Sequence, residues 1–291
     1  MSRLERPSRL RPFVGATVVC LSSLALIQCD RKSEPAAPVQ TEAPTASPAP
    51  ATVLTPKPVT ALTRVELVSA AGQAASAYAQ GRTPTDADPL VGRSFAVRIP
   101  FGCTGPSAPV EGAAADGVGR WSWGPDNKTI QISLTPGDWT GSALTVQAGS
   151  ADASAPTWEA VEGFWVPRPW LAAETCPGVQ ADPLQTAQAA ATPQTVGIAA
   201  VFETGGSRLG RRNGKAYTFT VRQEGEQPLA APVGGYRLLL EGRVVGFPGG
   251  RALQCRAHGP DQRPVCVVAV QLDKVTFEDA SGATLSEWRP G

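Results

Sequence analysis

The chain has 291 residues, is 42% hydrophobic and 6% aromatic, and carries a formal net charge of +1. Four arginines and one glutamate lie in its first 28 residues, so the remainder sums to −2. A protein that binds nucleic acid needs a clear basic excess or a basic stripe, and the part after residue 28 has no such excess. Composition therefore argues against nucleic acid as a partner, while it leaves enough apolar residues to build a core.

An export signal is predicted at the N-terminus. Four arginines between Arg3 and Arg11 precede an uncharged run over residues 12–28. The secretion machinery reads a basic flank ahead of an apolar segment of this length, and the Ser and Gly residues in the run make it a poor membrane span. We expect residues 1–28 to be a signal peptide or a membrane anchor, and the rest of the chain to act outside the cytoplasm.

The end of this segment, Leu26-Ile27-Gln28-Cys29, resembles the lipobox of bacterial lipoproteins, in which an aliphatic residue stands three places before a cysteine that becomes lipid-modified. Leu26 and Cys29 match the pattern, whereas Gln28 stands where these proteins have a small residue. The resemblance implies a lipid on Cys29 and attachment to a membrane. Asp30, directly after the cysteine, implies retention at the inner membrane, facing the periplasm. An uncleaved anchor and release as a soluble protein are the alternatives.

Residues 29–60 form a predicted linker. Seven prolines lie among Ala, Thr and Ser between Lys32 and Thr60. A segment of this composition has too little bulky apolar surface to offset the entropy of ordering, so it stays extended. At about 3 Å per residue its full reach is roughly 90 Å. It is either a passive spacer or a tether that lets the folded part engage a partner away from the bilayer.

One amphipathic helix is expected over residues 61–82. Thr63 and Glu66 have the spacing of a capping box, in which their side chains satisfy the first amides of a helix. Apolar residues then recur along one narrow stripe, at Leu67, Val68, Ala71, Ala74, Ala75 and Tyr78. Gly81 and the prolines that follow end the pattern. The stripe is rich in alanine, which predicts that the helix lies against a sheet.

From residue 91 the hydrophobic period changes to two, which predicts β-strands. The stretches are 95–99, 130–134, 144–148, 196–202, 217–221, 236–247, 265–272 and 275–277. Asn213-Gly214 has the residue types of a type I′ hairpin turn. No helical period separates the strands, so the predicted fold is mainly β, an antiparallel sandwich or barrel with one N-terminal helix. Its two β regions, 91–178 and 195–291, form one domain or two.

Four cysteines remain in the exported part, at Cys103, Cys176, Cys255 and Cys266. An even number in an oxidising compartment predicts two disulfides. Among three connectivities we favour Cys103 with Cys176 and Cys255 with Cys266, because the second pair flanks a Gly-Pro-Asp turn between two strands. The alternative is a zinc site built from Cys255, His258, Asp261 and Cys266, which uses the chain's only histidine. We expect no metal and no cofactor.

Aromatic residues crowd into positions 158–170, at Trp158, Phe164, Trp165 and Trp170, and Pro167, Arg168 and Pro169 lie between the last two tryptophans. Trp158, Trp165 and Trp170 held by stiff backbone could stack on sugar faces or on a proline-rich peptide, and Arg168 could add a cation–π contact. Tryptophan is also highly buried on average. The cluster is therefore either part of the core or a ligand platform.

Two further groups of charged residues have a possible function. Arg208, Arg211, Arg212 and Lys215 surround the predicted hairpin and suit an anionic envelope polymer or lipid headgroups, unless they are simply solvated. Asp138, Glu159, Glu162 and Glu174 could supply a carboxylate pair for glycoside cleavage. No nucleophile motif accompanies the histidine.

Taken together, the sequence predicts an envelope-tethered, non-enzymatic lipoprotein of the periplasm that acts as a binding or structural module. Its partners are the membrane, through the lipid or anchor, and an envelope glycan or a protein. The alternative is an extracytoplasmic hydrolase that cleaves envelope glycan through a carboxylate pair.

Overall fold

The computed structural model describes residues 60–82, 87–108, 115–146, 158–167, 172–177, 196–223, 225–257, 259 and 261–289. All of these belong to one unit of the chain, Pro56–Gly291, and the other unit is Met1–Thr55. The predicted signal, Cys29 and the predicted linker up to residue 59 lie outside the described residues.

Helix α1, Arg64–Ala79, begins with the predicted capping box. Thr63 donates its backbone amide to Glu66 Oε2 at 2.8 Å, and the Glu66 amide donates to Thr63 Oγ1 at 3.4 Å, so two amides at the helix start find acceptors. Leu67, Ala71 and Ala75 are buried against the strands that α1 covers, while Tyr78 is exposed. Within the described part of the chain, no helix is long and apolar enough to cross a membrane.

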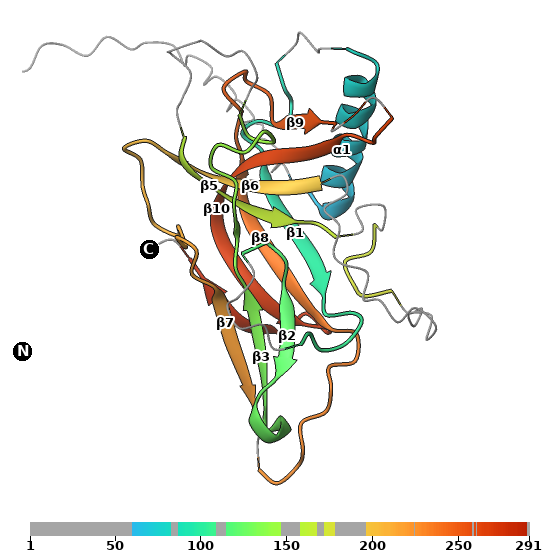
Figure 1. Cartoon of the computed structure of the whole chain (residues 1–291), viewed down its shortest axis with the longest axis vertical. Helices are drawn as coiled ribbons and strands as arrows, with labels where there is room; N and C mark the ends of the chain where they lie inside the picture. The colour runs from blue at the N-terminus through green and yellow to red at the C-terminus, as the bar shows by residue number, and fades with distance from the viewer. Residues whose placement is uncertain are drawn as a thin grey trace, which may run out of the picture. The chain divides into compact units, whose positions relative to one another are not determined.

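The larger sheet has the strand order β1-β8-β10-β6-β5-β4, with β9 and β11 also paired to β10 (Figure 1). Its strands are β1 Ser94–Phe101, β4 Gly137–Asp138, β5 Trp158–Trp165, β6 Val196–Glu203, β8 Tyr236–Val244, β9 Leu253–Arg256, β10 Val265–Asp279 and β11 Thr284–Trp288. All neighbours are antiparallel except β6 and β10, which run parallel from Val196–Cys266 to Ala200–Val270. Strands from both halves of the chain thus share one sheet.

The smaller sheet, in the order β2-β3-β7, is antiparallel. It consists of β2 Arg120–Trp123, β3 Thr129–Leu134 and β7 Tyr217–Arg222. Trp121 and Tyr217 of this sheet contact aromatic rings of the larger one, with centroids 6.4 Å from Tyr236 and 5.2 Å from Trp288. The main core lies between the two sheets and beneath α1. The predicted fold class, mainly β with one helix and antiparallel pairing, is confirmed, and the parallel β6–β10 pair was not predicted.

Strand β10 is one continuous strand of 15 residues where the sequence predicted two. Its register against β8 shifts between Leu272 and Lys274, which marks a β-bulge opposite Gly242. A Cβ on Gly242 would lie 2.0 Å from the Gln271 carbonyl oxygen, so only glycine allows this approach. Because a bulge bends its strand, β10 follows β6 and β9 in its first half and β8 and β11 in its second, along the bent course seen in Figure 1.

Two local predictions are wrong. The strand predicted at 144–148 is a turn in its described part, where Thr145 donates its hydroxyl to the Trp139 carbonyl at 2.7 Å. Asn213 and Gly214 do adopt positive φ angles of 55° and 76°, and the Lys215 amide donates to the Arg212 carbonyl at 3.0 Å. This turn does not close a hairpin, however, because β6 and β7 on its two sides belong to different sheets.

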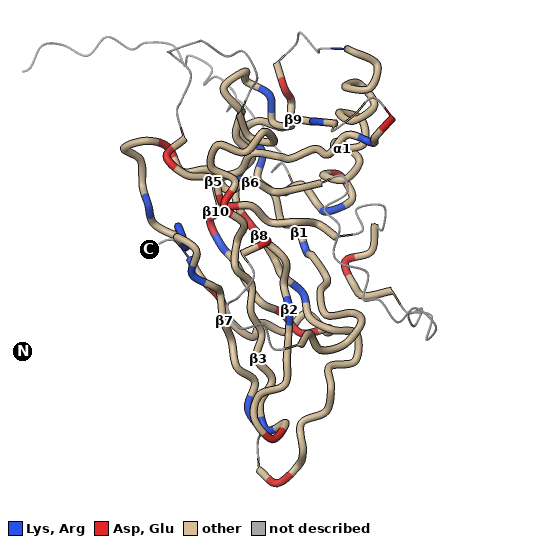
Figure 2. Tube along the Cα trace, viewed as in Figure 1, with Lys and Arg blue, Asp and Glu red and all other residues tan. Residues whose placement is uncertain are grey.

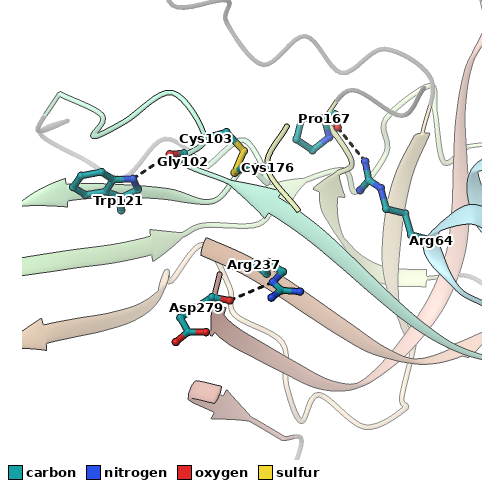
Figure 3. Close-up of a disulfide and its surroundings, with 8 residues drawn as sticks. All are labelled: Arg64, Gly102, Cys103, Trp121, Pro167, Cys176, Arg237 and Asp279. Carbon is teal, nitrogen blue, oxygen red and sulfur yellow. Dashed lines mark hydrogen bonds between the residues drawn. A yellow bond between two sulfur atoms is a disulfide. The ribbon is translucent and has the colours of Figure 1, made fainter. Parts of the chain in front are cut away.

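The structure contains the two favoured disulfides. Cys103–Cys176 joins the loop after β1 to the segment 172–177, next to Trp121, whose Nε1 donates to the Gly102 carbonyl at 3.3 Å (Figure 3). Cys255 and Cys266 occupy directly opposed positions of β9 and β10. A disulfide there leaves no free thiolate for the alternative zinc site, and His258 lies outside the described residues.

Candidate functional site

An open cleft of about 530 Å³ lies beside the bulge of β10. Gln271 to Val275 form its floor. One wall comes from the end of β6 and the connection after it, and the other from Trp288 and Arg289 at the end of β11. Phe202, Tyr217 and Trp288 give the cleft aromatic surfaces. A concave site with aromatic walls and a few convergent polar groups is the usual form of a binding site.

The cleft occupies the interval in which β10 changes its neighbour. Its pairing with β6 ends at Val270, and its pairing with β11 begins at Val275. The fold therefore opens the cleft by separating two strands that share one edge of β10. The local sequence marks this interval, because two polar residues in succession, Asp273 and Lys274, interrupt the apolar alternation.

We call residues 204–216, which connect β6 to β7, the arm. The arm forms one wall of the cleft and carries basic residues along its length (Figure 2). Glu159 on β5 accepts hydrogen bonds from Arg208 at 2.9 and 3.1 Å and from Arg211 at 2.9 Å. Two of the four residues of the predicted basic cluster, Arg208 and Arg211, thus hold the arm against β5.

Glu162 on β5 is the second point that fastens the arm. It is 7% exposed, and its Oε1 accepts the backbone amides of Arg212 at 2.7 Å and Asn213 at 2.8 Å. Burial raises the pKa of the Glu162 carboxyl above its ordinary value, although the two amides and nearby arginines oppose that effect. This carboxyl therefore holds the type I′ turn in place.

Arg212 joins the turn to the aromatic wall of the cleft. Its Nη2 donates to the Ala216 carbonyl at 2.5 Å, and its Cζ lies 4.5 Å from the centroid of the Tyr217 ring. The contact places a cation over the face of a buried aromatic ring, which is a favourable arrangement. Burial in turn raises the pKa of the Tyr217 phenol, so this group stays neutral.

The far side of the cleft carries a row of alternating charges. Lys274 on β10 forms ion pairs with Glu241 on β8 and, at 3.7 Å, with Glu287 on β11. Arg289 donates its Nε to Glu287 at 2.6 Å. The cations lining the cleft are Arg211, Arg212, Lys274 and Arg289, and the lining carboxylates are Glu203 and Asp273. The lining itself thus carries more positive than negative groups.

Trp158 and Trp165 of the predicted tryptophan platform do not line the cleft and pack against a smaller apolar cluster. Trp165 is half-buried with its ring 4.6 Å from that of Trp139, and Trp158 is half-buried 5.1 Å from Phe247. A Cβ on Gly163 would lie 2.0 Å from the Trp139 ring, so this glycine makes room for it. Arg168 and Trp170 lie outside the described residues, and the platform stays a prediction.

The predicted carboxylates are in two places. Asp138 and Glu162 are opposed in the β4–β5 pair, and Glu159 lies on the same strand β5. Glu174 instead forms an ion pair with Arg98 at 3.6 Å, in the segment joined by Cys176. None of the four lines the cleft. The two carboxylates that do, Glu203 and Asp273, were not singled out from the sequence.

The sequence reasoning also missed Leu209, Trp288 and the floor residues of the cleft. Asp273 and Lys274, two polar residues in succession, interrupt the apolar alternation of a strand, and this was the only sequence signal of the bulge. Leu209 gave a weaker signal, as an apolar residue close to basic ones, and it is 57% exposed in the structure. Their assembly depends on pairing between distant strands, which periodicity does not report.

Fold and site define a disulfide-bonded, mainly β protein with an open cleft at a strand bulge. No known protein family, characterised protein or solved structure that we compared with this chain gives a match. Its function is therefore argued from the cleft and from the sequence.

Proposed function

We propose that this chain is an envelope-tethered lipoprotein whose β unit acts as a noncatalytic binding module through the cleft. The observation that carries the proposal is the cleft itself, in which the part-exposed rings of Phe202 and Trp288 line the same cleft as Arg212 and Arg289. Aromatic surface supplies contact area, and polar groups at the rim orient a ligand.

The location belongs to the same proposal. The signal-like segment, the lipobox-like end at Cys29 and Asp30 support attachment to the inner membrane, with the β unit in the periplasm. Two disulfides fit an oxidising compartment outside the cytoplasm. The ligand is then an envelope component, either a glycan or a protein.

Binding is favoured over hydrolysis because of how the carboxylates are used. Glu159 is paired with two arginines of the arm, and Glu162 accepts two backbone amides. These contacts engage two of the four carboxylates that the sequence offered as an acid and a base, and none of the four lines the cleft.

Site-specific photo-crosslinking in living cells tests the proposal. A photoreactive residue replaces Leu209, which is 57% exposed on the wall of the cleft, in the full chain at its membrane. The same residue at Val233, which is 92% exposed and does not line the cleft, is the matched control. We expect one defined adduct from position 209 and none from position 233. The same adducts from both positions, or none from either, would contradict a binding role for the cleft.

A further inference from the structure

We propose that the ligand of the cleft is an extended peptide segment of a partner protein, which adds as a short strand to the edge of β10 over Gln271–Lys274. This inference rests on the proposed binding function and names the class of ligand. It follows from the pairing of β10, from the side chains around the unpaired interval and from the charge of the lining.

The register shows which edge of β10 is open. β8 pairs with β10 from Val270 to Asp279, and β6 lies on the opposite edge. Both β8 and β11 pair with Val275 to Glu278, so they must lie on opposite edges of β10. β11 therefore lies on the same edge of β10 as β6. Over Gln271–Lys274, no strand of the described residues pairs with this edge.

The opposite edge of the same interval is held in place. Gln271, Leu272 and Lys274 pair with Arg243, Gly242 and Glu241 of β8. Except at the bulged Asp273, the interval is therefore held as strand before any ligand arrives, so little of its own conformational entropy is lost on binding. At about 3.3 Å per residue it spans roughly 13 Å, which suits a peptide of about four residues. An edge of this kind is a template for a further strand, and peptides that add to it are recognised through their backbones.

Side chains around the interval supply contacts for a peptide. Leu209 on the arm and Trp288 on β11 line the cleft on its two sides, and Leu209 is 57% exposed. Their apolar surface can cover an apolar side chain of a bound strand. Such pockets for alternate side chains give specificity to strand addition.

Charge favours an acidic residue in the peptide. Four cations and two carboxylates line the cleft. Lys274 is already flanked by the carboxylates of Glu241 and Glu287. Arg212, in contrast, donates to backbone carbonyls. Arg289 contacts Glu287 through its Nε, and its side chain is 67% exposed. The guanidinium groups of Arg212 and Arg289 therefore remain able to form charge-assisted hydrogen bonds with a carboxylate.

The test uses the detergent-solubilised full chain and a phage-displayed library of random heptapeptides as the probe. We expect enriched peptides to carry an acidic and an apolar residue. Two derivatives of the best peptide are then made, each N-methylated at alternate residues. Since only alternate amides of an added strand face β10, one derivative should lose affinity about tenfold or more while the other keeps it.

Two further readouts place the peptide. Hydrogen exchange should show amides within Gln271–Lys274 that exchange in the free chain and become protected with peptide. Arg289→Glu should weaken binding of the acidic peptide about tenfold, whereas Arg222→Glu, an exposed charge reversal outside the cleft, should leave it unchanged.

The inference is overturned if no peptide is enriched, if both N-methylated derivatives bind as well as the parent, or if every amide of Gln271–Lys274 is already protected in the free chain. Binding of envelope glycan fragments in place of peptides would overturn it as well. If the peptide tests fail but crosslinking from position 209 still gives its defined adduct, the cleft keeps its proposed binding function and only the peptide ligand is ruled out. Loss of that adduct would instead remove the proposed function.

Discussion

The carboxylate of Glu162 on β5 accepts the backbone amide of Asn213 in the arm at 2.8 Å, across fifty-one positions of sequence. The amide of Arg212 donates to the same oxygen at 2.7 Å. One buried side chain thereby fixes the turn that leads into β7 and supports one wall of the cleft. Several consequences of this and other contacts can be measured.

Glu162 should make stability depend on pH in a defined direction. Because its pKa is raised in the folded chain, mainly by burial, the ionised form is less favourable there than in the unfolded chain. Relative to Glu162→Gln, the wild type should therefore lose stability as the pH rises from the ordinary glutamate pKa of about 4.3 through the raised value. Denaturant unfolding of both proteins across this range measures the difference. The opposite slope would mean that the amide bonds outweigh burial.

Glu162→Ala separates the hydrogen bonds from the charge. This change removes the acceptor of two amides, and leaving such donors unpaired costs about 1–3 kcal/mol. Glu162→Gln keeps an acceptor oxygen and is the matched control. Hydrogen exchange of the Arg212 and Asn213 amides should accelerate in the alanine variant alone, and equal acceleration in both variants would show that the charge is required.

An ion pair between Arg98 and the buried carboxylate of Glu278 links β1 to β10. Arg98 Nε lies 3.0 Å from Glu278 Oε2, and Glu278 is 3% exposed. Arg98→Ala would leave a buried carboxylate without this partner, and we expect a loss of about 2–4 kcal/mol after allowing for the part-exposed arginine. Arg289→Ala, in an exposed pair, should leave stability almost unchanged, because solvent screens such a pair. Chemical denaturation of the two variants compares them, and similar losses would contradict the assignment.

Two glycines should respond to alanine in opposite ways. At Gly163 a Cβ would lie 2.0 Å from the Trp139 ring, so Gly163→Ala must displace that ring and should cost about 1–3 kcal/mol. At Gly72, in α1, nothing lies within 4 Å, and Gly72→Ala should stabilise the chain by about 0.5–1 kcal/mol. Thermal unfolding measures both changes. A harmless Gly163→Ala would show that Trp139 is not held against β5.

The disulfides should differ in their contributions. Cys103 and Cys176 are 73 positions apart, and Cys255 and Cys266 are 11 apart. On the chain-entropy estimate the longer loop stabilises by about 4–5 kcal/mol and the shorter by about 3 kcal/mol. Replacing each pair by serine and measuring unfolding in denaturant gives the order. A larger loss from the shorter loop would indicate that native packing around Cys266, which is fully buried, dominates.

The sequence predicted those features that local chemistry controls. Thr63 and Glu66 gave the helix start, and alternation gave strands such as the one containing Phe95, Val97 and Ile99. It also favoured the correct disulfides, because Cys255 and Cys266 flank a short turn. Strand β5 was missed as a strand, since its residues from Ala160 to Phe164 are all buried and show no alternation.

The cleft could not be predicted in the same way. Phe202, Arg211, Leu272 and Trp288 come from three strands and a connection that are brought together by long-range pairing. Only the break at Asp273 and Lys274 marked the place, and it was interpreted as a gap between the predicted strands 265–272 and 275–277. A bulge in a continuous strand and a gap between strands give the same local pattern, because both interrupt the period of two.

The intact mass of the chain recovered from the membrane fraction of its own cells, before and after reduction, shows whether this protein is an exported lipoprotein with two disulfides. We predict a chain that begins at Cys29, carries added acyl mass, and gains four hydrogens when its two disulfides are reduced. A chain that retains its first 28 residues, or one without acyl mass, would contradict lipidation at Cys29. Free thiols before reduction would contradict the disulfides.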